Sequence, residues 1–305
     1  MPTPFRGITR REGMLVEGPA GWAEFSPFLD YDAAESAPWL AAALDSADRE
    51  WPAPLRDEIA VNCTVPAVGP DQAALIVRAS GCSTAKVKVA EKGQTIADDI
   101  ERVEAVRDAI GPRGNVRVDA NGGWSVNEAV SAIAALNLAA HGLEYVEQPC
   151  ASVEDLAAVR RKVGVPIAAD ESIRRAADPL RVVELDAADI AVLKVAPLGG
   201  VYACLRIAEQ IGLPVVVSSA VETSIGLAAG LALAAALPEL PYACGLATTS
   251  LLDGDVVASP LVPVHGFLPV GRPVLDQDSY AAVAADSETD QRWQQRLLDV
   301  RAMLG

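Results

Sequence analysis

Short runs of β-branched residues alternate with alanine-rich helical stretches from about residue 58 onward. Eight such runs occur, at 58–66, 85–90, 115–121, 143–149, 165–172, 189–197, 213–219 and 243–249. In five successive runs the equivalent strand-end residues are 88, 119, 147, 170 and 194, which are 31, 28, 23 and 24 positions apart. Each interval accommodates one strand and one crossover helix, so the strands are predicted to be parallel. This alternation limits the chain to a parallel α/β architecture.

The length of the repeating block selects among the parallel folds. An eight-stranded β/α barrel takes roughly 250 residues or somewhat fewer, and residues 58–264 supply a compact one. The open doubly wound sheet is the alternative, but no GxGxxG fingerprint follows the first predicted strand. We therefore predict that residues 58–264 form a β/α barrel that carries the catalytic site.

The beginning of the chain has a different pattern. Residues 5–30 contain two or three predicted antiparallel strands separated by glycine and proline turns, and a helix is expected at 37–47. Residues 1–57 are therefore predicted to form a small α+β capping domain, with residues 265–305 packing back on it.

Two further predictions concern the cap and the end of the chain. The segment that contains Trp22 and Phe25 is expected to cover the barrel mouth, although a place in the domain-interface core is the favoured alternative for one of the two rings. The sequence from 287 to 304 predicts a final helix, with Ser287 as its N-cap.

Alternation along the predicted strands identifies the side chains that point into the barrel. Residues two apart share a face of a strand, and one face of a barrel strand points inward. The inward sets are predicted to be Lys86 and Lys88; Arg117, Asp119 and Asn121; Tyr145 and Glu147; Ala168 and Asp170; and Ile190, Val192 and Lys194. Catalytic residues of such barrels lie at the carboxyl ends of the strands, where the charged members of these sets fall.

Three of these strands each end in an inward carboxylate, from Asp119, Glu147 and Asp170. Converging carboxylates repel one another unless a cation lies between them, and an oxygen-only ligand set favours Mg²⁺, with Mn²⁺ as a substitute. Both histidines, His141 and His265, lie outside the strand ends. The sequence therefore predicts a magnesium site at the mouth of the barrel.

Lysine is scarce in the chain, and three of its five lysines occupy predicted barrel positions. Arginine cannot lose its proton near neutral pH, whereas lysine can act as a base if its pKa falls from about 10.4. A second ammonium two residues away and a nearby divalent cation would both lower this pKa, so Lys86 is expected to lower the pKa of Lys88.

Glu171 is expected to point away from the face that carries Asp170. For Arg117, an ion pair inside the barrel and contact with substrate are equal alternatives.

These motifs, in their order along the chain, carry a resemblance. The stretches KVK, VDAN, EQP, ADES and LKVAPLGG resemble those of the enolase superfamily, in its muconate-lactonizing subgroup. Residues 5–28, VSSAVETSIGLAAG and GLATTSLLDGD are similar to o-succinylbenzoate synthases of the compact bacterial type. The resemblance covers nearly the whole chain and implies an α/β fold of the (β/α)7β type, a modified TIM barrel with a capping domain.

The resemblance also implies the chemistry. Asp119, Glu147 and Asp170 would bind Mg²⁺, Lys88 would be the base, and Lys194 would face it and stabilise an enediolate. The implied activity is a lyase reaction of menaquinone biosynthesis, the syn dehydration of 2-succinyl-6-hydroxy-2,4-cyclohexadiene-1-carboxylate to o-succinylbenzoate. Two facing lysines also suit an N-succinylamino acid racemase or a dipeptide epimerase, which is the alternative, and a cycloisomerase comes third.

Substrate contacts are predicted less directly than the charged residues. Ser218, Ser219, Asn121 and Gly245 are the predicted substrate-binding residues. For the two serines, capping of the following segment is an equal alternative. The substrate is expected to be a small dicarboxylate, because the predicted cations outweigh the predicted acids at the site.

Composition excludes several other classes of protein. The net charge of −16 argues against binding to nucleic acid or to an anionic membrane surface, since either needs a concentrated basic face. The chain shows no membrane span and no signal peptide, so a cytoplasmic protein is expected. The five cysteines contain no CxxC and are assigned no chemistry. Nothing in the sequence indicates an oligomeric state.

Overall fold

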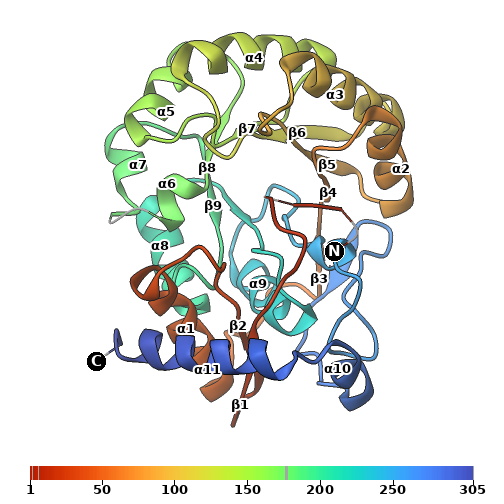
Figure 1. Ribbon diagram of the computed structural model, residues 1–305. Helices are drawn as coiled ribbons and strands as arrows, with labels where there is room; N and C mark the ends of the chain where they lie inside the picture. Colours follow the sequence, from red (N-terminus) through yellow and green to blue (C-terminus); the bar gives the residue numbers. More distant parts are fainter. Residues whose placement is uncertain (2, 6, 176–177, 305) are drawn as a thin grey trace.

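A curled sheet of seven parallel strands forms the centre of the molecule, and helices cover its outer face (Figure 1). The computed structural model describes residues 1, 3–5, 7–175 and 178–304. In order across the sheet, the strands are β4 (Cys63–Val65), β5 (Thr84–Lys88), β6 (Asn115–Asp119), β7 (Val146–Glu147), β8 (Ile167–Ala169), β9 (Ile190–Leu193) and β10 (Val215–Val217). Neighbours in sequence are neighbours in the sheet, as expected for successive βα units. The prediction of an α/β barrel is confirmed.

The eighth strand, predicted at 243–249, does not form as a full strand, so this prediction is wrong. It makes only two isolated parallel bridges, Val61 with Cys244 and Ser218 with Gly245. The backbone N–H groups of Cys244 and Gly245 donate to the carbonyls of Ala60 (2.8 Å) and Val217 (2.8 Å). This short segment therefore hydrogen-bonds to both edges of the sheet and closes the barrel without forming a full strand.

The first predicted run, 58–66, is divided in two. Residues Glu58–Ala60 form β3, which pairs antiparallel with β11 (Phe267–Pro269), and the barrel strand β4 begins only at Cys63. The chain therefore forms the first strand of a two-stranded ribbon before it enters the parallel sheet, and β11 completes that ribbon after the barrel.

The outer helices follow the strands, and three of them begin at a side-chain N-cap, namely Thr95, Ser125 and Ser152. The outer helices are α2 (Pro70–Ser80), α3 (Ile96–Ile110), α4 (Val126–Ala139), α5 (Val153–Arg160), α6 (Glu171–Arg174), α7 (Arg181–Glu184), α8 (Val201–Ile211) and α9 (Ser224–Ala236), with a 3₁₀ turn at Thr248–Leu251. Helices α3 and α4 each begin with a capping box, formed by Thr95 with Asp98 and by Ser125 with Glu128. Such reciprocal side-chain bonds satisfy N–H groups that the first helical turn leaves open. In the part of the chain that the structure describes, no helix is long and apolar enough to cross a bilayer.

Two separate apolar layers show that side chains alternate as predicted. The barrel interior contains the buried cluster of Tyr145, Ala168, Ile190, Val192 and Val216. The larger cluster lies between the strands and the outer helices and includes Val87, Val118, Val146 and Leu193. Residues one position apart on a strand therefore belong to different layers, as the period of two requires.

The N-terminal segment forms the predicted α+β unit. Strands β1 (Met14–Gly18) and β2 (Gly21–Phe25) pair antiparallel, and helix α1 (Ala33–Asp48) follows. Helices α10 (Gln277–Val283) and α11 (Ser287–Arg301) return at the end of the chain, and α11 lies beside α1 (Figure 1). The proposed boundaries of this cap, residues 1–57 with 265–305 packed against them, stay a prediction.

The aromatic residues of β2 lie in two different apolar clusters. Phe25 is buried in the cap core, where its ring meets the ring of Trp293 edge to face at 5.9 Å. Trp22 packs against the cluster of Ile225, Val256 and Val257. The alternative of an interface core therefore holds for these two side chains, which do not cover the barrel mouth. Phe28, at the end of the same segment, does line a cavity with Lys86, Lys88 and Lys194. Trp22 and Phe25 both belong to a paired strand, which fixes their direction.

The N-cap of α11 is Asp286, and the prediction of Ser287 is wrong. The Asp286 carboxylate accepts a hydrogen bond from the backbone N–H of Thr289 at 2.8 Å. Ser287 is already the first helical residue, so its hydroxyl is not placed to accept from the third. Glu288 and Asp290 then lie in the first turn, near the positive end of the helix dipole.

We expect Asp286→Ala to destabilise the first turn of α11 by about 0.5–2 kcal/mol, because an N-cap acceptor is lost. Hydrogen exchange at the Thr289 amide and the thermal unfolding midpoint would measure the change. Ser287→Ala is the matched control and should stay within roughly 0.5 kcal/mol of the wild type. Equal effects of the two substitutions would contradict the assignment of Asp286 as the cap.

Candidate active site

Six charged side chains gather at the carboxyl ends of five adjacent barrel strands. They are Lys86 and Lys88 on β5, Asp119 on β6, Glu147 on β7, Asp170 directly after β8 and Lys194 directly after β9. All six are buried. Lys88 pairs in register with Asp119, and Asp119 with Glu147, so the sheet itself brings these residues to one level. The convergence predicted from strand alternation is therefore present.

The lysines of β5 contact the acids of the next two strands. Lys86 Nζ donates to both carboxylate oxygens of Glu147, at 2.9 and 3.0 Å, and lies 3.4 Å from Asp119 Oδ2. Lys88 Nζ donates to Asp119 Oδ2 at 2.5 Å and to Asn121 Oδ1 at 2.6 Å. The two lysines thus share Asp119, which places Lys86, Lys88 and two of the three acids in a single ionic cluster.

The pKa shifts in this cluster have opposing causes. Burial would raise the pKa of Asp119, but the charges of Lys88 and Lys86 outweigh burial and hold it well below its ordinary value. Burial and the neighbouring charge of Asp119 raise the pKa of Glu147. Burial would lower the pKa of Lys86, but the charges of Glu147 and Asp119 hold it above its ordinary value. The pKa values in this cluster are therefore set by burial together with two kinds of close neighbour, carboxylates and ammonium groups.

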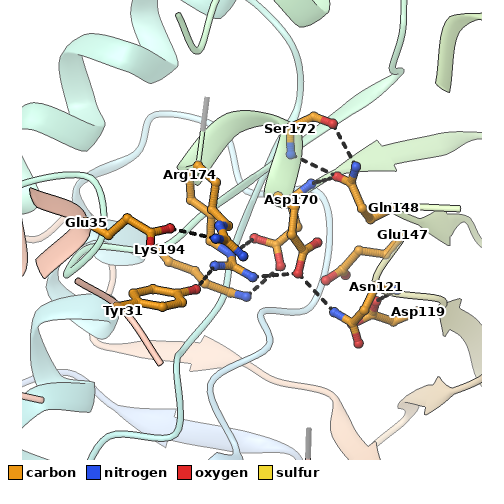
Figure 2. A network of polar contacts seen from close by, with 12 residues as sticks. Tyr31, Glu35, Asp119, Asn121, Glu147, Gln148, Asp170, Ser172, Arg174 and Lys194 are labelled. Carbon is orange, nitrogen blue, oxygen red and sulfur yellow. Dashed lines mark hydrogen bonds and ion pairs between the residues drawn. The ribbon is translucent and has the colours of Figure 1, made fainter. Parts of the chain in front are cut away.

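Asp170 has a cation on each of its carboxylate oxygens (Figure 2). Lys194 Nζ donates to Oδ2 at 2.6 Å, and Arg174 Nε donates to Oδ1 at 2.9 Å. Burial would raise the pKa of Asp170, yet Arg174 and Lys194 keep it below its ordinary value. Burial is the main reason that the pKa of Lys194 is lowered. Asp170 is thus fixed from two sides.

Glu171 lies in the same network, so the expectation that it points away is wrong. Its Oε1 accepts from Arg174 Nη2 at 2.5 Å and from Asn121 Nδ2 at 3.2 Å. The strand β8 ends at Ala169, and Glu171 is the first residue of α6. Alternation across a strand does not apply once the chain has turned into a helix.

Arg174 is a site residue that strand alternation could not find. It follows Asp170 by four positions and lies on the short helix α6, where that spacing brings two side chains to the same face. A basic residue four positions after a predicted ligand was the available signal in the sequence.

Gln148 supports the loop that carries Asp170. Its Oε1 accepts from the backbone N–H groups of Asp170 (3.0 Å) and Ser172 (3.1 Å). Its Nε2 donates to the carbonyl of Cys150 (2.9 Å) and the hydroxyl of Ser172 (2.7 Å). The amide therefore has partners on both of its polar atoms while it is fully buried. Gln148 also has a left-handed φ of 41°, which an ordinary side chain rarely adopts.

The predicted substrate-binding residues line the cavity that also contains the lysines. Its walls include Lys86, Lys88, Asp119, Lys194, Asn121, Ser218, Ser219, Gly245 and Thr248. Strand alternation did not identify the apolar part of the lining, which is Phe5, Phe28, Ala220 and Val221. Lys88 Nζ lies 5.1 Å from the centroid of the Phe5 ring. The cavity thus combines cationic groups with apolar walls.

The two serines do not cap a helix. Helix α9 begins at Ser224 with Thr223 as its N-cap, which excludes the capping alternative for Ser218 and Ser219. The hydroxyl of Ser219 is 2.6 Å from that of Thr248, and Ser218 Oγ donates to the carbonyl of Gly245 at 3.4 Å. A Cβ at position 245 would lie 2.6 Å from Ser218 Oγ, so this close approach requires glycine.

Arg117 forms the ion pair inside the barrel, which was one of its two alternatives. Its Nε donates to Glu144 Oε2 at 2.7 Å, and its Nη1 donates to the Tyr145 hydroxyl at 2.9 Å and to the carbonyl of Ala243 at 2.8 Å. These partners occupy the guanidinium, and Arg117 is not part of the cavity lining.

The three carboxylates supply the hard oxygen donors that Mg²⁺ prefers. Among the residues that the structure describes, however, no group of three or more His, Cys, Asp or Glu side chains is arranged to hold a metal ion. Each acid instead contacts an ammonium or guanidinium group. The donor set fits a divalent cation in its chemistry and its burial, and the assignment of Asp119, Glu147 and Asp170 as metal ligands stays a prediction.

Comparisons with known proteins agree with the geometry. A family model described as Enolase C-terminal domain-like matches residues 70–273, and one described as Enolase N-terminal domain-like matches residues 1–47. The o-succinylbenzoate synthase of Thermobifida fusca is 64% identical over 300 residues, which are 98% of this chain and 93% of that protein. The o-succinylbenzoate synthase of Mycolicibacterium smegmatis is 56% identical over 305 residues, which are 100% of this chain and 94% of that protein.

A solved structure extends the comparison. The dipeptide epimerase from Enterococcus faecalis V583, complexed with Mg and the dipeptide L-Leu-L-Tyr, is 31% identical and superposes with a TM-score of 0.62. The match covers 72% of this chain and 63% of that one. About three quarters of this chain therefore shares its fold with a protein of a different named activity.

Proposed function

The chain belongs to the enolase superfamily, and from this premise we propose that it is an o-succinylbenzoate synthase. The observation that carries the proposal is the placement of Lys88 and Lys194. They extend from β5 and β9, between which lie β6, β7 and β8, and both line one cavity. A substrate in that cavity would contact Lys88, Lys194 and Asp119. The other two acids, Glu147 and Asp170, bind Lys86 and Lys194 of the cavity lining.

Lys88 is the proposed base. It removes the proton α to the carboxylate of 2-succinyl-6-hydroxy-2,4-cyclohexadiene-1-carboxylate, and the electron pair of that C–H bond moves into the carboxylate to give an enediolate. The pair then returns to form the new double bond as the C–O bond breaks. Lys88 delivers its proton to the departing hydroxide, which leaves as water. One lysine serves both transfers, so both occur on the same face of the ring and the elimination is syn.

Lys194 is the proposed electrostatic partner. Its ammonium is held by Asp170 on the side of the cavity opposite Lys88, where it can donate to the charge that develops on the substrate carboxylate. Lys86 is bound to Glu147 and Asp119, so its part is to hold these acids beside Lys88. Its predicted effect on the basicity of Lys88 stays a prediction.

Asp119, Glu147 and Asp170 are the residues that would hold Mg²⁺, with Mn²⁺ as a substitute. When bound, the cation would supply fixed positive charge that stabilises the charge developing on the substrate carboxylate. This would lower the free energy of the transition state by an amount on the order of several kcal/mol. Ser218, Ser219, Gly245 and Asn121 are proposed to bind the substrate, because they line the same cavity. A place in menaquinone biosynthesis and a cytoplasmic location stay predictions.

The test of the function is an ultraviolet assay for aromatisation of the cyclohexadiene substrate. We expect the wild type to form o-succinylbenzoate and Lys88→Ala to lose about 10²- to 10⁴-fold or more in kcat, because the base is absent. Lys194→Ala should lose about 10²- to 10³-fold, as expected for one electrostatic donor. Lys162→Ala is the control, since Lys162 follows α5 at the far end of the barrel and is exposed. Full turnover by Lys88→Ala would refute the assigned base.

Removal of divalent cations gives an independent test. Treatment with EDTA followed by gel filtration should abolish turnover, and added Mg²⁺ should restore it, because the three acids would lose the ion that they hold. Asp119→Asn with intact circular dichroism should not be restored by the Mg²⁺ concentration that restores the wild type. Unchanged turnover after removal of the cation would show that these acids have another role.

Epimerisation is the second candidate, because two lysines that face one cavity can remove a proton from one side and return one from the other. Incubation with N-succinyl amino acids in deuterated buffer, followed by NMR of the α-proton, separates the two reactions. We expect exchange or racemisation to be slower than aromatisation of the cyclohexadiene. Racemisation faster than dehydration would make the epimerase assignment the correct one.

A further inference from the structure

Arg174 joins the candidate metal ligand Asp170 to the cap. Its side chain is buried and uses each of its three nitrogens for a different partner. Nε donates to Asp170 Oδ1 at 2.9 Å, Nη1 donates to the Tyr31 hydroxyl at 2.7 Å, and Nη2 donates to Glu171 Oε1 at 2.5 Å. A planar guanidinium with three fixed partners cannot rotate without breaking at least one of these bonds.

Tyr31 comes from the cap, and its hydroxyl accepts from Arg174 (Figure 2). It lies between β2 and α1, and its ring meets those of Phe28 at 5.5 Å and Trp39 at 6.1 Å, edge to face in both contacts. Tyr31 belongs to the buried core of the cap, while its hydroxyl reaches Arg174 of the barrel. The cap core therefore fixes the position of Arg174 Nη1 through the Tyr31 hydroxyl.

Asp170 depends on this contact for its orientation. Lys194 occupies Oδ2, so Oδ1 is the oxygen that Arg174 holds. With one oxygen held from each side, the carboxylate is fixed about its terminal torsion, which is otherwise broad. Loss of a group that orients a metal ligand in this way typically weakens metal binding about 10- to 100-fold.

We propose that Arg174, anchored by the Tyr31 hydroxyl of the cap, is a positioning residue that orients Asp170 for binding a divalent cation. The proposal rests on the function proposed above, since it assumes that Asp170 is a metal ligand. It assigns the cap a direct part in building the metal site, in addition to enclosing the substrate.

The sign of the change in metal affinity separates positioning from simple charge compensation. Arg174→Met removes a positive charge next to an acidic site, and a purely electrostatic role would make Mg²⁺ bind more tightly. The positioning role predicts the opposite, an affinity that is about 10- to 100-fold weaker. Arg174→Lys keeps the charge but loses the planar set of donors, and it should also bind Mg²⁺ more weakly than the wild type. Tyr31→Phe removes one hydrogen bond and should weaken binding by roughly 3- to 10-fold.

Binding is measured without substrate, from the electron paramagnetic resonance of free Mn²⁺ and from the rise of the unfolding midpoint with Mg²⁺ concentration. Circular dichroism checks that each variant is folded, and Tyr31→Phe is the mildest of them. Because turnover is not the readout, a wild type that fails to aromatise the cyclohexadiene would overturn the proposed function and leave this measurement intact.

Glu35→Gln is the matched control. Glu35 of α1 makes an exposed ion pair with Arg175 at 2.6 Å, so it also joins the cap to the end of α6, but it has no contact with Asp170. We expect its Mn²⁺ affinity to equal that of the wild type. Metal binding by Arg174→Met as tight as in the wild type would overturn the proposal. Equal losses in Glu35→Gln and Tyr31→Phe would do the same, because docking of the cap in general would then explain them.

Discussion

The burial of like charges at the strand ends is the constraint on which the rest of the site depends. Asp119, Glu147 and Asp170 are fully buried and come from three adjacent strands, so each needs a cation within hydrogen-bonding reach. The chain supplies Lys86 and Lys88 from the preceding strand and Lys194 from the following one. The acids and their partners thus occupy neighbouring strands because a parallel barrel brings all carboxyl ends to one level.

This arrangement explains why the barrel cannot form the site alone. Asp170 is at the outer end of the acid row, where β8 has already ended and the chain turns into α6. There the second cation comes from the helix, as Arg174, and its anchor comes from the cap, as Tyr31. Phe28 extends from the same cap segment into the lining of the cavity. The cap thus contacts the charged residues and the substrate cavity through residues a few positions apart.

Sequence reasoning succeeded where one local rule determines the direction of a side chain. The period of two placed Lys86, Lys88, Asp119 and Glu147 correctly, because all four belong to paired strands. The rule failed at Glu171, where the strand had ended. Tyr31 and Gln148 could not be found from periodicity, since the one reaches Arg174 across 143 positions and the other adopts a left-handed backbone conformation. Contacts of that kind depend on tertiary packing, which a single sequence does not display.

The charges of the completed site match the substrate that the proposed function requires. The sequence predicts three acids and three lysines at the site, with Glu171 pointing away from them. The structure adds Glu171, and it adds Arg174 as well, so the balance of acids and bases is unchanged. With the four acids ionised and Lys88 neutral, as the proposed base requires, the side chains sum to −1, and a divalent cation would leave one positive charge for a substrate with two carboxylates. A charged cluster that gains net positive charge only with its cation would bind a dicarboxylate weakly until the metal is in place, because the attraction between the two comes mainly from the ion.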